Sequence, residues 1–216
     1  MNEESLAKFQ SVFDLKETVR NNAISLSREI VQKCRKAVYA IHRGEPKLAM
    51  SMINEGKELL STIDSELEEF PDVYYGGFVE HSQQELVETI ILYELIFNGS
   101  DLKKIPTPEC INVSYVAYLN GLADVPGELR RHILSVIRDN NANEGEHYLK
   151  LMEDIYSILI IFDYPDVLLK GLRHKTDRIH SLIERTEGDL TNAMMQQQLE
   201  NSMKRFDSTL TEKKIT

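Results

Sequence analysis

Four carboxylates at two helical spacings are the residues of this sequence best suited to chemistry. Glu85 and Glu88 stand three residues apart, and Asp124 and Glu128 stand four apart. Either spacing puts two side chains on one face of a helix. If the two helices pack with these faces opposed, the four carboxylates converge and repel one another unless cations bind between them. Surface helices often carry such pairs, so each pair alone is also compatible with a solvated face.

The donor chemistry of such a cluster favours Mg²⁺ or Mn²⁺. Its ligands would all be oxygens, which suit these ions better than zinc. One or two such ions can orient a phosphodiester, activate water and stabilise the leaving oxygen. His81 and His132 each lie one helical turn from one of these pairs. Each is either a proton shuttle or extra ligand, or an ordinary polar histidine, which is the commoner case.

Basic side chains near the N-terminus form a second candidate surface. Arg28, Arg35 and His42 recur every seven residues, which gives a nearly straight stripe on a helix. Such a stripe suits nucleic-acid phosphates, although it is equally typical of a solvated face. The aromatic stretch at 74–78 either stacks on unpaired bases or, more commonly, packs inside the protein. The residues expected to contact nucleic acid are Arg28, Arg35, Lys36, His42, Arg43, Arg130 and Arg131.

The composition excludes several classes of protein. Of 216 residues, 42% are hydrophobic and 28% charged, which is too apolar for a disordered chain. The net charge of −10 argues against a protein that coats nucleic acid nonspecifically, but residues 1–50 hold nine Lys and Arg against six Asp and Glu. No apolar run approaches the roughly 20 residues that cross a membrane. The N-terminus is acidic and the two cysteines show no metal-ligand spacing, so we expect a protein of the reducing cytoplasm.

Helical periodicity dominates the chain and must position these residues. We expect a turn at 139–143 and helices over residues 5–43, 46–69, 71–97, about 109 to 126, 144–164 and 165–190. Pro126 should kink or break its helix, because it lacks an N–H and clashes with the preceding turn. The sequence therefore predicts an all-α, single-domain bundle of about six or seven helices over residues 1–216, with the last twenty or so residues polar and frayed.

The segments around the four acidic residues are similar to stretches of a known family. Residues 118–131 read YLNGLADVPGELRR. This segment resembles the D-x-x-G-E-L-x-R stretch that recurs in the translin/TRAX family. The QELVE sequence at 84–88 resembles the Q-E-Y-V-E stretch of TRAX, the catalytic member of the pair. Further similarity, partly to archaeal relatives, extends over nearly the whole chain and includes residues 27–29, 41–43, 152–156 and 163–173.

The resemblance implies a seven-helix fold and closed homo-oligomeric shells that bind RNA or single-stranded DNA on their inner surface, with a hexamer and an octamer both open. The four acidic positions that carry Mg²⁺-dependent endoribonuclease activity in TRAX map onto Glu85, Glu88, Asp124 and Glu128. We therefore expect an Mg²⁺-dependent endoribonuclease acting on single-stranded RNA. One alternative is a translin-like protein that binds single-stranded RNA or DNA without cutting it. Another is a helical scaffold whose acidic cluster binds metal only for stability.

Overall fold

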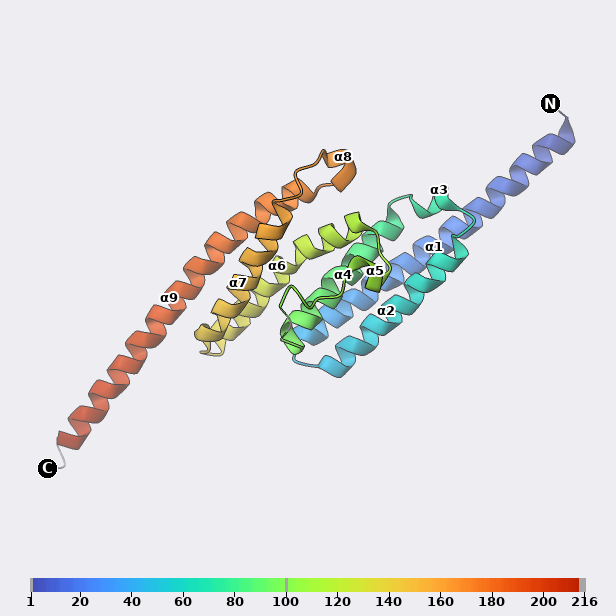
Figure 1. The fold of residues 1–216 in the computed structure, drawn as a ribbon. Helices are drawn as coiled ribbons and strands as arrows, with labels where there is room; N and C mark the ends of the chain where they lie inside the picture. Colours follow the sequence, from blue (N-terminus) through green and yellow to red (C-terminus); the bar gives the residue numbers. More distant parts are fainter. Residues whose placement is uncertain (1, 100, 214–216) are drawn as a thin grey trace. The chain divides into compact units, whose positions relative to one another are not determined.

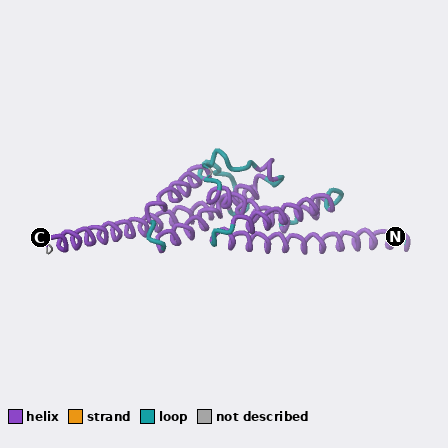
Figure 2. The backbone as a smooth tube through the Cα atoms, turned by 90° about the horizontal axis from the view of Figure 1, so that it is seen from below, coloured by secondary structure: helices purple, strands orange, loops and turns teal. Residues whose placement is uncertain are grey.

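The computed structural model describes residues 2–99 and 101–213, with the backbone alone described for 207–213. In these residues the chain is all-α, as predicted, with six long helices, three of a single turn and no strand (Figures 1 and 2). The helices are α1 (Glu3–His42), α2 (Pro46–Glu66), α3 (Pro71–Tyr74), α4 (Phe78–Phe97), α5 (Pro108–Ile111), α6 (Tyr115–Arg138), α7 (Ala142–Leu159), α8 (Asp166–Leu169) and α9 (Leu172–Lys213).

Short local signals set the ends of the first helices. Asn2 caps α1, because its side-chain oxygen accepts a hydrogen bond from the Ser5 N–H at 3.1 Å. Gly44 turns the chain out of α1 at a φ of 70°, in the left-handed region that glycine enters without steric cost, and Pro46 opens α2. Gly77, at a φ of 94°, separates α3 from α4 where the sequence predicted one continuous helix.

Pro126 does not break its helix, since α6 runs through it to Arg138. Val125 and Leu129 are buried on either side of the proline, so their packing offsets the hydrogen bond that it removes. The boundary between two compact units falls at the same place. Unit 1 comprises Met1–Val125 and Tyr164–Leu172, and unit 2 comprises Pro126–Asp163 and Arg173–Thr216. The single domain expected over 1–216 stays a prediction.

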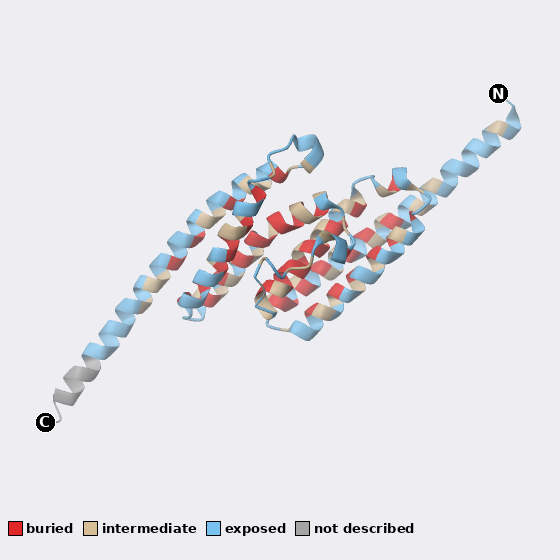
Figure 3. Ribbon diagram, viewed as in Figure 1, coloured by how far each residue is buried: buried red, intermediate tan, exposed pale blue. Residues whose placement is uncertain are grey.

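The core of unit 1 lies where α1, α2 and α4 pack against one another. Figure 3 shows the buried residues of these helices on their facing sides, whereas the first turns of α1 are exposed. Each fully buried Leu or Ile side chain contributes about 1.5–3 kcal/mol of hydrophobic free energy, so this core fixes the helices that carry the site. Its largest fully buried side chains are Ile30, Ile41, Ile63, Leu67, Leu86, Ile91, Leu92 and Leu95.

Within unit 1, α6 packs closely against α4 at Gly121. A Cβ atom on Gly121 would lie 2.6 Å from the Gln84 carbonyl oxygen and 2.8 Å from the Val87 Cβ. These distances leave room for hydrogen only, so the approach requires glycine. The contact places Asp124, one turn later in α6, beside α4.

Unit 2 is built from the second part of α6 with α7 and α9. Gly145 of α7 packs against α6 and α9, because its added Cβ would meet Ile133 at 3.3 Å and Leu190 at 2.7 Å. The Gln197 side chain of α9 donates a hydrogen bond to the Asn140 carbonyl at the α6–α7 turn. The largest fully buried side chains here are Leu129, Ile133, Met152 and Ile155.

The two longest helices, α1 and α9, have 40 and 42 residues and carry charged side chains over most of their length. A membrane-spanning helix needs about 20 mostly apolar residues in a row. In the part of the chain that the structure describes, no helix is both long and apolar enough to span a membrane. The cytoplasmic location expected from the sequence stays a prediction.

Candidate nucleic-acid interface and acidic residues

Three of the four acidic residues singled out by the sequence lie in unit 1. Glu85 and Glu88 are half-buried on α4, and Asp124 is half-buried on α6. The Gln84 side-chain N–H donates a hydrogen bond to the Asp124 carboxylate at 2.7 Å. Asp124 therefore lies next to the turn of α4 that carries Glu85, although the two helices are far apart in the sequence.

The glutamates of α4 also lie close to α1. Burial raises the pKa of the Cys34 thiol to about 12, and the charges of Glu85 and Glu88 add to this rise. Like charges disfavour a nearby thiolate only over a short range, so both carboxylates lie near this part of α1. Glu85 is also 3.9 Å from His81, one turn earlier in α4, and the two form an ion pair when the histidine is protonated.

Glu128 follows Asp124 by one turn of α6 but belongs to unit 2. Its half-buried carboxylate lies 3.6 Å from the Arg131 guanidinium, which is three residues further along the same helix. His132 packs edge-on against Tyr148, with 4.5 Å between the ring centroids. This contact gives His132 a packing role, and its catalytic or ligand role stays a prediction.

The donor set of the acidic residues fits Mg²⁺ or Mn²⁺, since it consists only of carboxylate oxygens. Among the described residues, however, no group of three or more His, Cys, Asp or Glu side chains is arranged to hold a metal ion. The structure therefore brings Asp124 next to α4, as the predicted metal site requires. The side chains of the described residues do not form the complete set of ligands for a metal ion. The Mg²⁺ site stays a prediction for Glu85, Glu88, Asp124 and Glu128.

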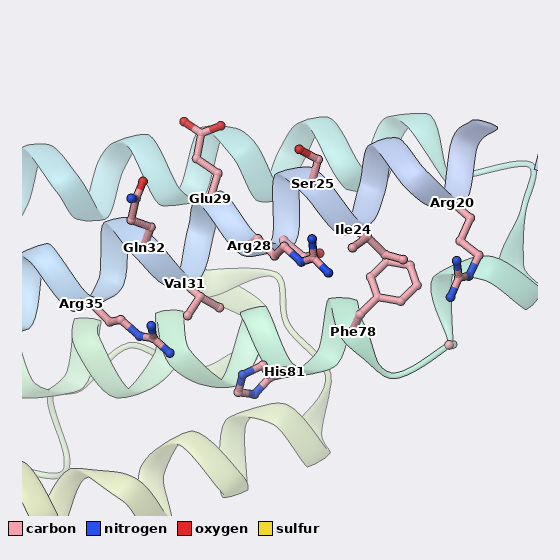
Figure 4. Close-up of a pocket in the computed structure, with 12 residues that line it drawn as sticks. Arg20, Ile24, Ser25, Arg28, Glu29, Val31, Gln32, Arg35, Phe78 and His81 are labelled. Atoms are coloured by element: carbon pink, nitrogen blue, oxygen red, sulfur yellow. The ribbon is translucent and has the colours of Figure 1, made fainter. Parts of the chain in front are cut away.

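A basic pocket of about 970 Å³ opens between α1 and the start of α4 (Figure 4). Arg20, Arg28 and Arg35 line it from α1, and His81 lines it from α4. The only acidic side chain among its lining residues is Glu29. The pocket therefore has a positive potential although the chain as a whole is acidic, and a positive concave surface attracts phosphate groups.

The same pocket has an apolar wall. Ile24 and Val31 of α1 and Phe78 of α4 contribute it, and in Figure 4 the Phe78 ring lies beside Ile24. Ser27 also lines the pocket, and its side chain is buried. The combination of cations and an apolar wall suits a nucleotide.

The other basic residues expected on α1 occupy three environments. Lys36 is exposed and lines a second pocket together with Arg35. Arg43 is held by Glu45, with 2.8 Å between the guanidinium Nε and the carboxylate. His42 is half-buried. Arg28, Arg35 and Lys36 are therefore the predicted α1 contacts that the structure places in pockets.

Arg130 and Arg131 of α6 differ in how their charges are used. The Arg130 guanidinium donates hydrogen bonds to the Thr186 hydroxyl at 2.9 Å and to the Asp189 carboxylate at 2.7 Å. These bonds hold α6 to α9 within unit 2 and leave fewer donors for a phosphate. Arg131 is exposed and contacts only its neighbour Glu128 among the ion pairs of the described residues.

Residues 18–190 match the sequence model of the Translin family. The chain belongs to the Translin family. The matched range contains the basic pocket and all four acidic residues. The recognition of the family from its sequence motifs is thereby confirmed.

This Translin-family chain has relatives, and some of them have solved structures. The chain is 35% identical over 199 residues to an uncharacterized protein of Methanocaldococcus jannaschii, and the match covers 91% of this chain and 86% of that protein. It is 31% identical to AfC3PO in its complex with duplex RNA, with a TM-score of 0.80 over 88% of this chain and 97% of that one. Apo-NeC3PO is 22% identical, with a TM-score of 0.79 over 89% and 98% of the two chains, and shares the fold.

Two residues that line the pockets of this Translin-family chain, Arg20 and Tyr39, were not expected from the sequence. Arg20 lines the pocket, and Tyr39 lines the second pocket, yet neither belongs to the seven-residue stripe. The signal was present in the spacing, since Arg20 precedes Arg28 by eight residues and Tyr39 follows Arg35 by four. For the aromatic stretch at 74–78 the sequence left base stacking and packing open, and the structure places Phe78 in the lining of the basic pocket.

Proposed function

We propose that this Translin-family chain binds RNA, with phosphates held in the basic pocket of α1 and α4. The observation that carries the proposal is the convergence of Arg20, Arg28, Arg35 and His81 on that one pocket. Support comes from AfC3PO, a 31% identical protein of the same fold that has been solved with duplex RNA. Arginine suits this task because its planar guanidinium forms paired hydrogen bonds with phosphate oxygens.

The local charge explains how an acidic chain would bind a polyanion. The net charge of −10 opposes approach at long range, but this repulsion is screened beyond roughly 8 Å at physiological salt. Within the pocket three guanidiniums face the ligand against one carboxylate. Binding would therefore depend on the fit of phosphates to this site rather than on general attraction.

Replacing Arg28 and Arg35 together with alanine is expected to weaken RNA binding by about 100-fold or more, since each arginine removed loses a charged hydrogen bond worth about 1.5–3 kcal/mol. The slope of log affinity against log salt should also fall by about 0.7 for each phosphate of a single strand that the variant no longer neutralises. Fluorescence anisotropy of a labelled RNA over a salt series measures both quantities. Arg185→Ala, which removes an exposed arginine of α9, is the matched control and should bind as the wild type. Equal affinity of all three proteins would remove the basis of the proposal.

A finer proposal is that the chain is an Mg²⁺-dependent endoribonuclease acting on single-stranded RNA. The observation that favours it is the Gln84–Asp124 hydrogen bond, which joins the two segments that carry the acidic motifs. Glu85, Glu88, Asp124 and Glu128 would hold the ion, and the bound ion would supply an activated water for phosphodiester hydrolysis. The competing proposal is binding of single-stranded RNA or DNA without cleavage, which would survive the loss of all four carboxylates.

Exposed apolar side chains support the further proposal of a homo-oligomeric shell. The first turns of α1 expose Phe9 and Phe13, and the last turns of α9 expose Leu199 and Phe206. Exposed clusters of large apolar residues are typical of surfaces that another protein covers. A hexamer and an octamer both satisfy the proposal.

A further inference from the structure

A second pocket adjoins the basic pocket along α1. It has a volume of about 470 Å³ and lies between α1 and α2. Its lining shares Gln32 and Arg35 with the basic pocket, so the two pockets are neighbours on one exposed face of α1. The volume is within the roughly 300–1,000 Å³ that is typical of small-molecule sites. The lining residues are Gln32, Arg35, Lys36, Tyr39, Leu48 and Met52.

An exposed aromatic ring is the main feature of this second pocket. Tyr39 is 56% exposed, although an aromatic side chain on a long packed helix would gain free energy from burial. Leu48, on the α2 side of the pocket, is 49% exposed. Met52 of α2 is half-buried beside them. The pocket therefore presents a ring and two flexible apolar side chains to solvent.

Two charged side chains, Arg43 and Glu45, hold the Tyr39 ring in place. The Arg43 guanidinium lies over the Tyr39 ring, with 5.5 Å from its Cζ to the ring centroid, and an Nη lies 3.4 Å from the phenol oxygen. Glu45 fixes that guanidinium from the other side. Tyr39 lines the pocket and Arg43 does not, and more than half of the Tyr39 side chain is exposed.

We propose that this second pocket binds one unpaired base of an RNA strand, which stacks on Tyr39 while its neighbouring phosphates contact Arg35 and Lys36. The inference rests on the proposed RNA binding, because Arg35 would join the two pockets along one strand. Base stacking on an exposed aromatic ring beside basic side chains is the usual way in which proteins hold single strands. A base inside a duplex has both faces covered by its neighbours and cannot enter the pocket in this way.

The charges around the pocket support a polyanion as the occupant. Glu55 of α2 is the acidic group that faces Lys36, and Lys33 holds its carboxylate at 2.5 Å. The pKa of Glu55 is lowered mainly by its hydrogen bond with Lys33. The Glu55 carboxylate is therefore already paired with the Lys33 ammonium. Arg35 and Lys36 therefore keep their charge available for phosphates.

The test compares two ligands and four proteins. The ligands are a short single-stranded RNA and a fully abasic ribose-phosphate oligomer of the same length. The proteins are the wild type, Tyr39→Leu and Tyr39→Phe, with Tyr115→Leu as the matched control, because Tyr115 is also exposed but is hydrogen-bonded to Glu109. All the substituted residues are exposed, so we expect each variant to keep the thermal stability of the wild type, which circular dichroism checks.

The inference predicts that Tyr39→Leu weakens binding of the intact RNA by about 5- to 100-fold, which is the range for one stacked base. Tyr39→Phe should bind as the wild type, because it keeps the ring. On the abasic oligomer the wild type and Tyr39→Leu should bind equally. Equal binding of intact RNA by the wild type and Tyr39→Leu, with Arg28→Ala plus Arg35→Ala still weakened, would overturn this inference and leave the proposed function standing. No binding of RNA by the wild type would overturn both.

Discussion

Replacing Glu88 and Glu128 together with glutamine is expected to lower the rate of Mg²⁺-dependent cleavage of single-stranded RNA by about 100-fold or more. An amide is a much poorer ligand for Mg²⁺ than a carboxylate, and even changes around metal ligands cost about 10- to 100-fold in activity. RNA affinity should stay within about threefold of the wild type, because the proposed phosphate contacts are arginines of α1, whereas Glu88 lies on α4 and Glu128 on α6. The measurement is single-turnover cleavage of an end-labelled RNA, with binding measured in parallel.

The matched control for this pair is Glu144→Gln plus Glu146→Gln. Both residues are exposed on α7, so their replacement changes the net charge of the chain by the same amount without touching either acidic motif. The control variant should cleave the RNA at the wild-type rate. EDTA should stop cleavage by the wild type and by the control variant. Wild-type cleavage by the Glu88 and Glu128 variant would show that these carboxylates do not carry catalysis. RNA binding by the wild type without cleavage in Mg²⁺ or Mn²⁺ would favour the binding protein over the nuclease.

Gly121→Val is expected to lower the free energy of unfolding by about 3 kcal/mol, roughly a 100-fold change in the folding equilibrium. The added Cβ alone would lie 2.6 Å from the Gln84 carbonyl oxygen, and a backbone oxygen cannot move aside as a flexible side chain can. The helices α4 and α6 must separate, and the Gln84–Asp124 hydrogen bond must lengthen with them. Urea denaturation followed by circular dichroism measures the decrease.

Gly127→Val is the control for this substitution. Gly127 lies six residues further along the same helix, and a Cβ added there meets no atom within 4 Å. Its stability should stay within about 0.5 kcal/mol of the wild type, because valine is a slightly better helix former than glycine. If both variants were equally stable, the close approach of α4 and α6 at Gly121 would be wrong.

Local signals in the sequence were sufficient for most of the helices. Gly44 and Pro46 predicted the end of α1 and the start of α2 to within a residue or two of their observed positions. Both residues act through their own backbone geometry. Asn140, in the predicted turn, has a positive φ of 58°, which asparagine tolerates better than most residues. These features depend on neighbours in the sequence and can be predicted from them.

Packing between distant segments decided what the sequence could not show. Pro126 was expected to kink or break its helix; α6 is not broken there, because packing on both sides of the proline outweighs its local cost, and the kink stays a prediction. Arg130 was expected to contact nucleic acid, which stays a prediction, and two of its hydrogen bonds go to residues more than 50 positions later. Neither outcome leaves a trace in the local pattern.

For the acidic motifs, residue spacing and family resemblance predicted only part of the structure. Their residue types and their family were evident from the sequence, and the family is confirmed. The hydrogen bond between Gln84 and Asp124 depends on the glycine contact between α4 and α6, which no periodicity reveals.

Photocrosslinking tests the central claim, RNA binding on the exposed face of α1, most directly. The intact protein is irradiated with a single-stranded RNA that carries 4-thiouridine, and the crosslinked peptides are identified by mass spectrometry. We predict crosslinks within residues 20–39 and at Phe78, because the α1 residues that line the two pockets lie in this range and Phe78 lines the basic pocket. Crosslinks confined to peptides outside α1 and the start of α4 would contradict the account.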